Sequence, residues 1–155
     1  MIDPLNPKLF FAAYVEEAIN IRLGMCQPSV TTYLTDLLAS NIHVSKVELT
    51  RKFEQIVSEL KSRQKSEELL QLALHRSMAD KALFWIGVYP ERLAEVGRCD
   101  MLRTQGVKSY EVAWQLSHSD DKPSKDVFHT LHRQFDECAR GLRLARESWE
   151  ADAEV

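Results

Sequence analysis

Apolar residues recur along most of the chain with the 3.6-residue period of α-helices. Proline suits the first turn of a helix and glycine its end, so Pro7 and Gly24 bound a helix predicted over residues 8–23. A second helix is predicted from Ser29, a favoured N-cap residue. Its apolar face comprises Val30, Tyr33, Leu34, Leu37 and Leu38.

The middle of the chain predicts two more helices and a short turn. Ser45 and Glu48 have the spacing of a capping box, which opens a helix. A longer helix is predicted over residues 66–89, amphipathic at first and then apolar on every side, so its second half should be the most buried segment. Pro90 suits the start of a short helical turn, which Gly97 ends.

The last third predicts one helix from about Val107 and a final long helix from Ser124 to Trp149, separated by a polar loop at residues 120–123. The final helix has a strict heptad seam, the period of helices that wrap around one another. The seam residues are Phe128, Leu131, Phe135, Cys138, Leu142, Ala145 and Trp149. We expect a homodimer through this seam, because its end would otherwise expose apolar surface. Packing inside one chain is the alternative.

The fold class follows from what these segments share. No segment has the period-two alternation of a strand, so we predict an all-α fold, a bundle of five or six helices with a long C-terminal helix. A chain of 155 residues with 45% hydrophobic residues suits a single helical domain over residues 1–155. The most apolar run, residues 82–89, is far shorter than the roughly 20 residues that span a bilayer, so no membrane contact is expected.

Charge and cysteine usage narrow the class of protein. A net charge of −3 gives no overall basic field, so no nucleic-acid partner is expected. Cys26, Cys99 and Cys138 are odd in number and far apart, which fits neither a disulfide framework nor a cysteine zinc site. The N-terminus lacks a basic leader followed by an apolar run. Together these features predict a cytoplasmic protein.

Two groups of polar residues have spacings that matter for chemistry. Arg76 and Asp80 lie four residues apart on a largely apolar side of the predicted helix, which favours a partly buried structural ion pair over a functional site. His129, His132 and Asp136 share neighbouring positions on the last helix, but no facing helix carries a second ligand set. We therefore expect no metal and no cofactor. The chain also lacks a nucleophile elbow, a P-loop and a GxGxxG fingerprint.

The central part of the chain resembles a family of uncharacterised bacterial all-helical proteins over about residues 29–117. The motifs that carry the resemblance are Tyr33-Leu34-x-x-Leu37-Leu38, Asp80-x-x-Leu83-Phe84-x-x-Gly87-x-Tyr89-Pro90-Glu91, Asp100 and Gly106-x-x-Ser109-Tyr110. Ala79 departs from the pattern, which has glycine before the aspartate. The resemblance implies no activity. It implies that Asp80, Glu91, Asp100 and Tyr110 are candidate residues for binding a ligand or partner.

Each of these four candidates also has a structural explanation. Asp80 pairs with Arg76 or caps a turn, and Glu91 complements a helix start. Asp100 caps a short turn, and Tyr110 packs with its hydroxyl satisfied.

Two functions remain open from the sequence. The leading hypothesis is a small cytoplasmic protein-interaction module or adaptor that self-associates and has a protein partner, because apolar helix surface is abundant and no catalytic constellation is present. The alternative is a small-molecule-binding protein or enzyme with a site in the central block of aromatic and acidic residues. The aromatic members of that block are Phe84, Trp85, Tyr89, Tyr110 and Trp114, for which core packing is the simpler explanation.

Overall fold

A computed structural model gives the structure of the protein and describes residues 6–42 and 67–153. These residues contain helices and no strand, which confirms the all-α prediction. The predicted helix that Ser45 opens lies outside the described residues. The elements follow in this order: α1 Pro7–Glu16, the π-helix η1 Glu17–Arg22, α2 Pro28–Asn41, α4 Glu67–Val88, α5 Pro90–Val96, α6 Cys99–Leu116, α7 Lys125–Arg133 and α8 Phe135–Ala153.

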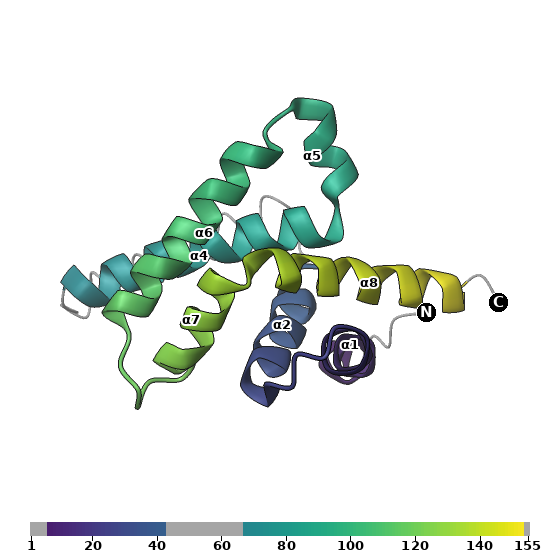
Figure 1. The fold of residues 1–155 in the computed structure, drawn as a ribbon, viewed down its shortest axis with the longest axis horizontal. Helices are drawn as coiled ribbons and strands as arrows, with labels where there is room; N and C mark the ends of the chain where they lie inside the picture. The colour runs from purple at the N-terminus through teal and green to yellow at the C-terminus, as the bar shows by residue number, and fades with distance from the viewer. Residues whose placement is uncertain (1–5, 43–66, 154–155) are drawn as a thin grey trace.

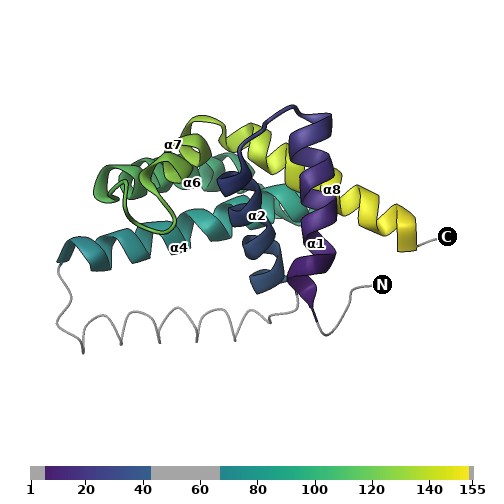
Figure 2. The same cartoon turned by 90° about the horizontal axis from the view of Figure 1, so that it is seen from below.

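The first two helices begin and end at residues that suit those positions. Asn6 is the N-cap of α1, and its side-chain oxygen accepts a hydrogen bond of 3.1 Å from the backbone N–H of Leu9. The helix continues into η1, and the chain then turns at Gly24, whose φ of +70° is in the left-handed region. After this turn α2 packs against α1 (Figure 2).

Helix α4 lies at the centre of the arrangement. The short helix α5 follows the C-terminal end of α4 and reverses the chain, so that α6 returns across α4 (Figure 1). Helix α8 also crosses α4 (Figure 2). Glycines allow both crossings to be close. A Cβ on Gly87 would lie 2.9 Å from the Cβ of Leu142, and one on Gly106 would lie 2.9 Å from the Cβ of Ala82. Larger residues at either position would push the helices apart.

One hydrophobic core joins α1, η1, α2, α4, α6, α7 and α8. The buried residues of α4 all lie in its second half, where the pattern becomes apolar on every side. No described helix is both long and apolar enough to cross a membrane. The largest fully buried side chains are Tyr110, Phe11, Phe128, Phe135, Ile19 and Leu34.

The predicted final helix is two helices. Gln134, with φ −121° and ψ 37°, interrupts it between α7 and α8, and α8 is the long C-terminal helix, of 19 residues. Both helices nevertheless turn their seam residues into the same core, so the heptad spacing survives the break. From Phe128 to Ala145 the seam residues are buried. The indole of Trp149 lies against the ring of Phe11 at 5.1 Å, so α1 covers the end of the seam.

The reason given for a dimer therefore does not hold. The seam packs within one chain, and its C-terminal part is not an exposed apolar stripe. The start of α6 was also predicted too late, at Val107 instead of Cys99. Most residues in the first two turns of α6 are exposed and polar, so they have no apolar stripe that marks a helix.

Candidate functional site

Asp80 of α4 is the centre of a hydrogen-bonded cluster that three helices build. Its Oδ1 accepts a hydrogen bond of 2.5 Å from the hydroxyl of Tyr33 in α2 and one of 2.6 Å from the hydroxyl of Tyr110 in α6. Arg76 lies one turn earlier on α4, with its Nε 3.7 Å from Asp80 Oδ2 and 3.2 Å from the Tyr33 hydroxyl. We call these four residues the Asp80 cluster.

The electrostatics of the Asp80 cluster follow from burial. Burial raises the pKa of Asp80, while the charge of Arg76 and the two tyrosine hydroxyls hold that rise back. Burial, together with the nearby charge of Asp80, raises the pKa values of Tyr33 and Tyr110 well above their ordinary value. Both hydroxyls therefore stay protonated and donate to the carboxylate over the neutral pH range.

Arg76 is held by its Nε and by two aromatic rings. Its guanidinium carbon lies 5.2 Å from the ring centroid of Tyr33 and 5.9 Å from that of Phe128. The side chain is still 43% exposed, against 23% for Asp80. Among the described residues, none accepts a hydrogen bond from Nη1 or Nη2 of Arg76. Within the part of the chain that the structure describes, these donors are available to a bound molecule.

An open groove of about 740 Å³ lies over Tyr33, Arg76 and Asp80. The polar face of α2 forms one wall, the middle of α4 contributes Arg76 and Asp80, and the loop between α6 and α7 forms another wall. Most of the lining residues have polar side chains. Besides these three residues, the groove is lined by Ser29, Thr32, Asp36, Leu37, Ser40, Asn41, Ser119, Asp120, Asp121, Lys122, Pro123, Ser124 and Val127.

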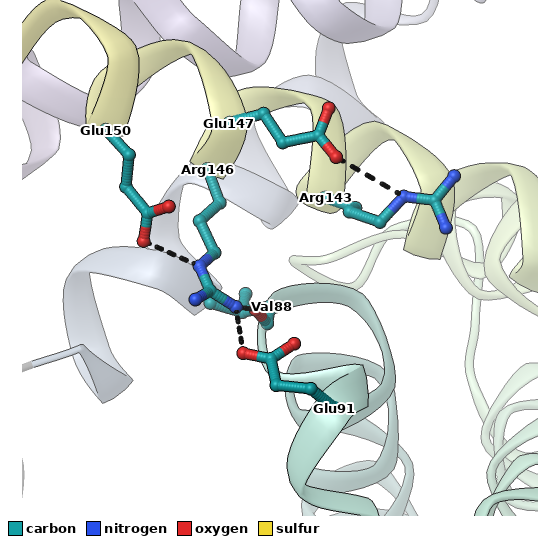
Figure 3. Close-up of polar contacts among 6 residues, drawn as sticks. All are labelled: Val88, Glu91, Arg143, Arg146, Glu147 and Glu150. Carbon is teal, nitrogen blue, oxygen red and sulfur yellow. Dashed lines mark hydrogen bonds and ion pairs between the residues drawn. The ribbon is translucent and has the colours of Figure 1, made fainter. Parts of the chain in front are cut away.

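The structure places Glu91 in a different cluster, at the start of α5. Its Oε1 lies 2.6 Å from Nη1 of Arg146 in α8, and the same guanidinium contacts Glu150 and the backbone carbonyl of Val88 (Figure 3). The hydrogen bond from Arg146 lowers the pKa of Glu91. Glu91 neither lines the groove nor hydrogen-bonds to Asp80. It helps to join α5 to α8.

Of the four candidates, the Asp80 cluster contains only Asp80 and Tyr110. Tyr110 is fully buried, so it acts through Asp80 and does not reach the groove surface. Asp100 is exposed in the first turn of α6, where a carboxylate complements the helix dipole. It does not line the groove.

Sequence reasoning missed Tyr33 and the polar wall of α2. Tyr33 belongs to a predicted apolar face and to the resemblance motif but is not among the four candidate residues, although a buried tyrosine hydroxyl requires a hydrogen-bond partner. The wall had a detectable signal, because its polar residues follow the helical period along α2. Those residues are Ser29, Thr32, Asp36 and Ser40.

The histidines considered as metal ligands have other contacts. The ring of His132 stacks on Trp114 at 6.2 Å, with its Nδ1 3.2 Å from the carbonyl of Val107, and the ring of His129 lies 4.8 Å from that of Trp114. Asp136 forms a two-bond ion pair with Arg103. Within residues 6–42 and 67–153, no group of three or more His, Cys, Asp or Glu is placed to hold a metal ion.

Comparisons with family models, with curated proteins and with solved structures found no match to this chain. The resemblance to a bacterial all-helical family therefore stays a prediction.

Proposed function

We propose that this protein binds a small polar molecule in the groove over the Asp80 cluster. The observation that carries the proposal is the combination of this groove with the half-exposed guanidinium of Arg76, whose Nη donors have no hydrogen-bond acceptor among the described residues. Its volume of about 740 Å³ is within the range of pockets that hold metabolite-sized ligands, about 300 to 1,000 Å³. The many polar side chains along the groove favour a ligand with several hydrogen-bonding groups.

The cost of the Asp80 cluster supports this proposal. Holding a carboxylate and a guanidinium in a partly buried site costs desolvation energy, and apolar residues of similar size often stabilise such a position as well or better. In the Asp80 cluster, two tyrosine hydroxyls and an ion pair offset that cost and fix the direction of Arg76. A cluster that only filled space would not need a charged group at the groove surface.

The interaction module that the sequence favours stands as the alternative proposal. Its partner, including a second copy of the chain, would have to use a surface other than the heptad seam, which is buried. We place the protein in the cytoplasm as part of the same proposal. Its three cysteines are free thiols, which fits a reducing compartment.

A screen with a matched pair of variants tests the binding proposal. Thr32 is exposed and lines the groove, so Thr32→Trp fills the groove without disturbing the core. Thr104 is exposed on α6 outside the groove, so Thr104→Trp is the control. Thermal unfolding is followed with amino acids, organic acids, sugars, nucleotides and polyamines, because a molecule that binds the native state raises the melting temperature.

We expect at least one compound to stabilise the parent and Thr104→Trp but not Thr32→Trp. No stabilisation by any compound class, or stabilisation that Thr32→Trp leaves unchanged, would contradict binding in this groove.

A further inference from the structure

Resting on the proposed function, we propose that the ligand joins an oxyanion, either a carboxylate or a phosphate, to hydrogen-bond-donating groups. Arg76 holds the oxyanion, and acidic side chains of the groove accept from the donors. This assigns a ligand class to the groove and a role to Arg76 that its ion pair with Asp80 does not account for.

The geometry of Arg76 carries the first part of the inference. Its Nε donates to Tyr33 and faces Asp80, so that edge of the guanidinium is occupied inside the Asp80 cluster. The Nη donors are free of hydrogen bonds to any described residue, and the side chain lines the groove. A guanidinium presents its donors in a planar fork that matches the two oxygens of a carboxylate or phosphate.

The guanidinium of Arg76 is held in place before a ligand binds, unlike a mobile charged side chain on the surface. The rings of Tyr33 and Phe128 pack against the guanidinium, and Tyr33 is itself fixed by its bond to Asp80. Tyr110 fixes the same carboxylate from the other side. Little conformational entropy is therefore lost when an oxyanion docks on Arg76.

A second arginine shows what an occupied fork looks like in the same protein. Arg103 of α6 donates from Nε and Nη2 to the two carboxylate oxygens of Asp136, at 2.6 and 2.7 Å. Its fork is filled within the chain. Arg76 has no equivalent carboxylate across the fork among the described residues, and this difference makes Arg103 the internal control.

The charges around the groove support the second part of the inference, which is that acidic side chains accept hydrogen bonds from the ligand. Asp80 is neutralised by Arg76, and Asp36 is paired with Lys8 at 3.2 Å. Asp120 and Asp121 line the loop wall beside a single cation, Lys122. A bare anion would be repelled by that wall, whereas an oxyanion that also carries hydroxyl or ammonium groups donates to these carboxylates.

NMR detection of the arginine Nε–Hε signals tests the inference directly. The carboxylate probes are acetate and L-serine, the phosphate probes are methyl phosphate and glycerol 3-phosphate, and glycerol is the neutral control. The Arg76 signal is assigned by its loss in Arg76→Lys, which keeps the charge but removes the fork. Thr32→Trp, at an exposed position, is the second variant and fills the groove without replacing any member of the Asp80 cluster.

We expect one oxyanion arm to shift the Arg76 signal while the Arg103 signal stays in place, with the donor-bearing member binding more tightly. Thr32→Trp should abolish the shift, and Arg76→Lys should weaken binding about tenfold by calorimetry. Which arm responds identifies carboxylate or phosphate as the source.

Three results would overturn the inference: no shift at Arg76 with any oxyanion, equal shifts at Arg76 and Arg103, or an equal effect of glycerol. If the broader screen then finds a neutral or cationic compound that stabilises the parent but not Thr32→Trp, the groove binds a ligand, but the ligand has no oxyanion. If no compound binds in the groove at all, both proposals are wrong.

Discussion

Asp80 supports three other side chains at once. Removing its carboxylate leaves the hydroxyls of Tyr33 and Tyr110 without their acceptor and Arg76 without its counter-charge. Unpaired polar groups cost more when they are buried, and both tyrosines are buried. The carboxylate therefore matters for folding as well as for the direction of Arg76.

We predict that Asp80→Ala lowers the free energy of unfolding by about 3 kcal/mol, because it breaks a partly buried pair and leaves its partners unsatisfied. Asp120→Ala, at an exposed loop position, should change it by less than about 0.5 kcal/mol. Urea denaturation of both variants measures the difference. Equal urea midpoints for Asp80→Ala and the parent would show that the Asp80 cluster does not stabilise the fold.

The ion pair of Arg103 with Asp136 predicts a pH effect at a second residue. The hydrogen bonds from Arg103 lower the pKa of Asp136, so the native state releases this proton more readily than the unfolded chain. The resulting stability is present above the unfolded pKa, about 3.9, and is lost as the pH falls through the native pKa. Both side chains are largely exposed, so the stabilisation is small.

Arg103→Ala should therefore raise the pKa of Asp136 toward its ordinary value. Carbon NMR of the Asp136 carboxyl group during an acid titration measures this change. Arg98→Ala, which removes an exposed arginine outside this ion pair, is the control and should leave the titration unchanged. A midpoint for Asp136 that does not move in Arg103→Ala would show that the pair is absent in solution.

Contacts between residues that are close in the sequence could be predicted, whereas contacts between residues of distant helices could not. The spacing of Arg76 and Asp80 is local, so one helical turn was enough to place them side by side. Tyr33 and Tyr110 reach the same carboxylate from two other helices, 47 and 30 residues away. No periodicity within one helix specifies which residues of two different helices meet.

At the scale of the elements, Arg146 connects three helices. Its guanidinium contacts the carbonyl of Val88 at the end of α4, Glu91 of α5 and Glu150 of its own helix α8 (Figure 3). It also lies 4.8 Å from the ring centroid of Tyr89. The carbonyls in the last turn of a helix have no partner within the helix, so the contact with Arg146 also satisfies Val88. Arg146 therefore fixes the corner where α4 turns into α5.

We predict that Arg146→Ala lowers the free energy of unfolding by about 1 to 2 kcal/mol, because its side chain is mostly buried and holds several acceptors. Arg143→Ala is the matched control one turn earlier. Arg143 is 52% exposed and lies 4.0 Å from Glu147, so its loss should cost less than about 0.5 kcal/mol. Equal effects of the two variants in thermal denaturation would contradict the role of Arg146.

Some helix boundaries can be predicted from the sequence, and others cannot. Pro7, Pro28 and Pro90 lie at the starts of helices, as proline's missing N–H and fixed φ favour. The break at Gln134 has no such marker, and the heptad spacing continues across it because both helices face one core. A pattern that reports only which side is apolar does not distinguish one long helix from two short ones.

At the scale of the whole molecule, the seam of α7 and α8 is a part of the core. Leu142 is fully buried, and its Cβ lies where Gly87 of α4 leaves room for it. Phe11 of α1 packs on Trp149 near the far end of α8. The long C-terminal helix thus joins the first helix of the chain to the central one.

The concentration dependence of unfolding distinguishes a seam that packs within one chain from a seam that joins two chains. Leu142→Ala leaves a cavity beside Gly87, so it should lower the free energy of unfolding by about 2 to 5 kcal/mol. Unfolding of a single chain does not depend on protein concentration, whereas unfolding of a dimer does. We therefore expect the difference between parent and variant to stay constant over about a hundredfold range of concentration. Leu34→Ala, a buried α2 residue outside the seam, should behave in the same way. The opposite result would be an unfolding midpoint of the parent that rises with protein concentration, with the rise lost in Leu142→Ala and kept in Leu34→Ala. That result would show that the seam is an interface between two copies of the chain.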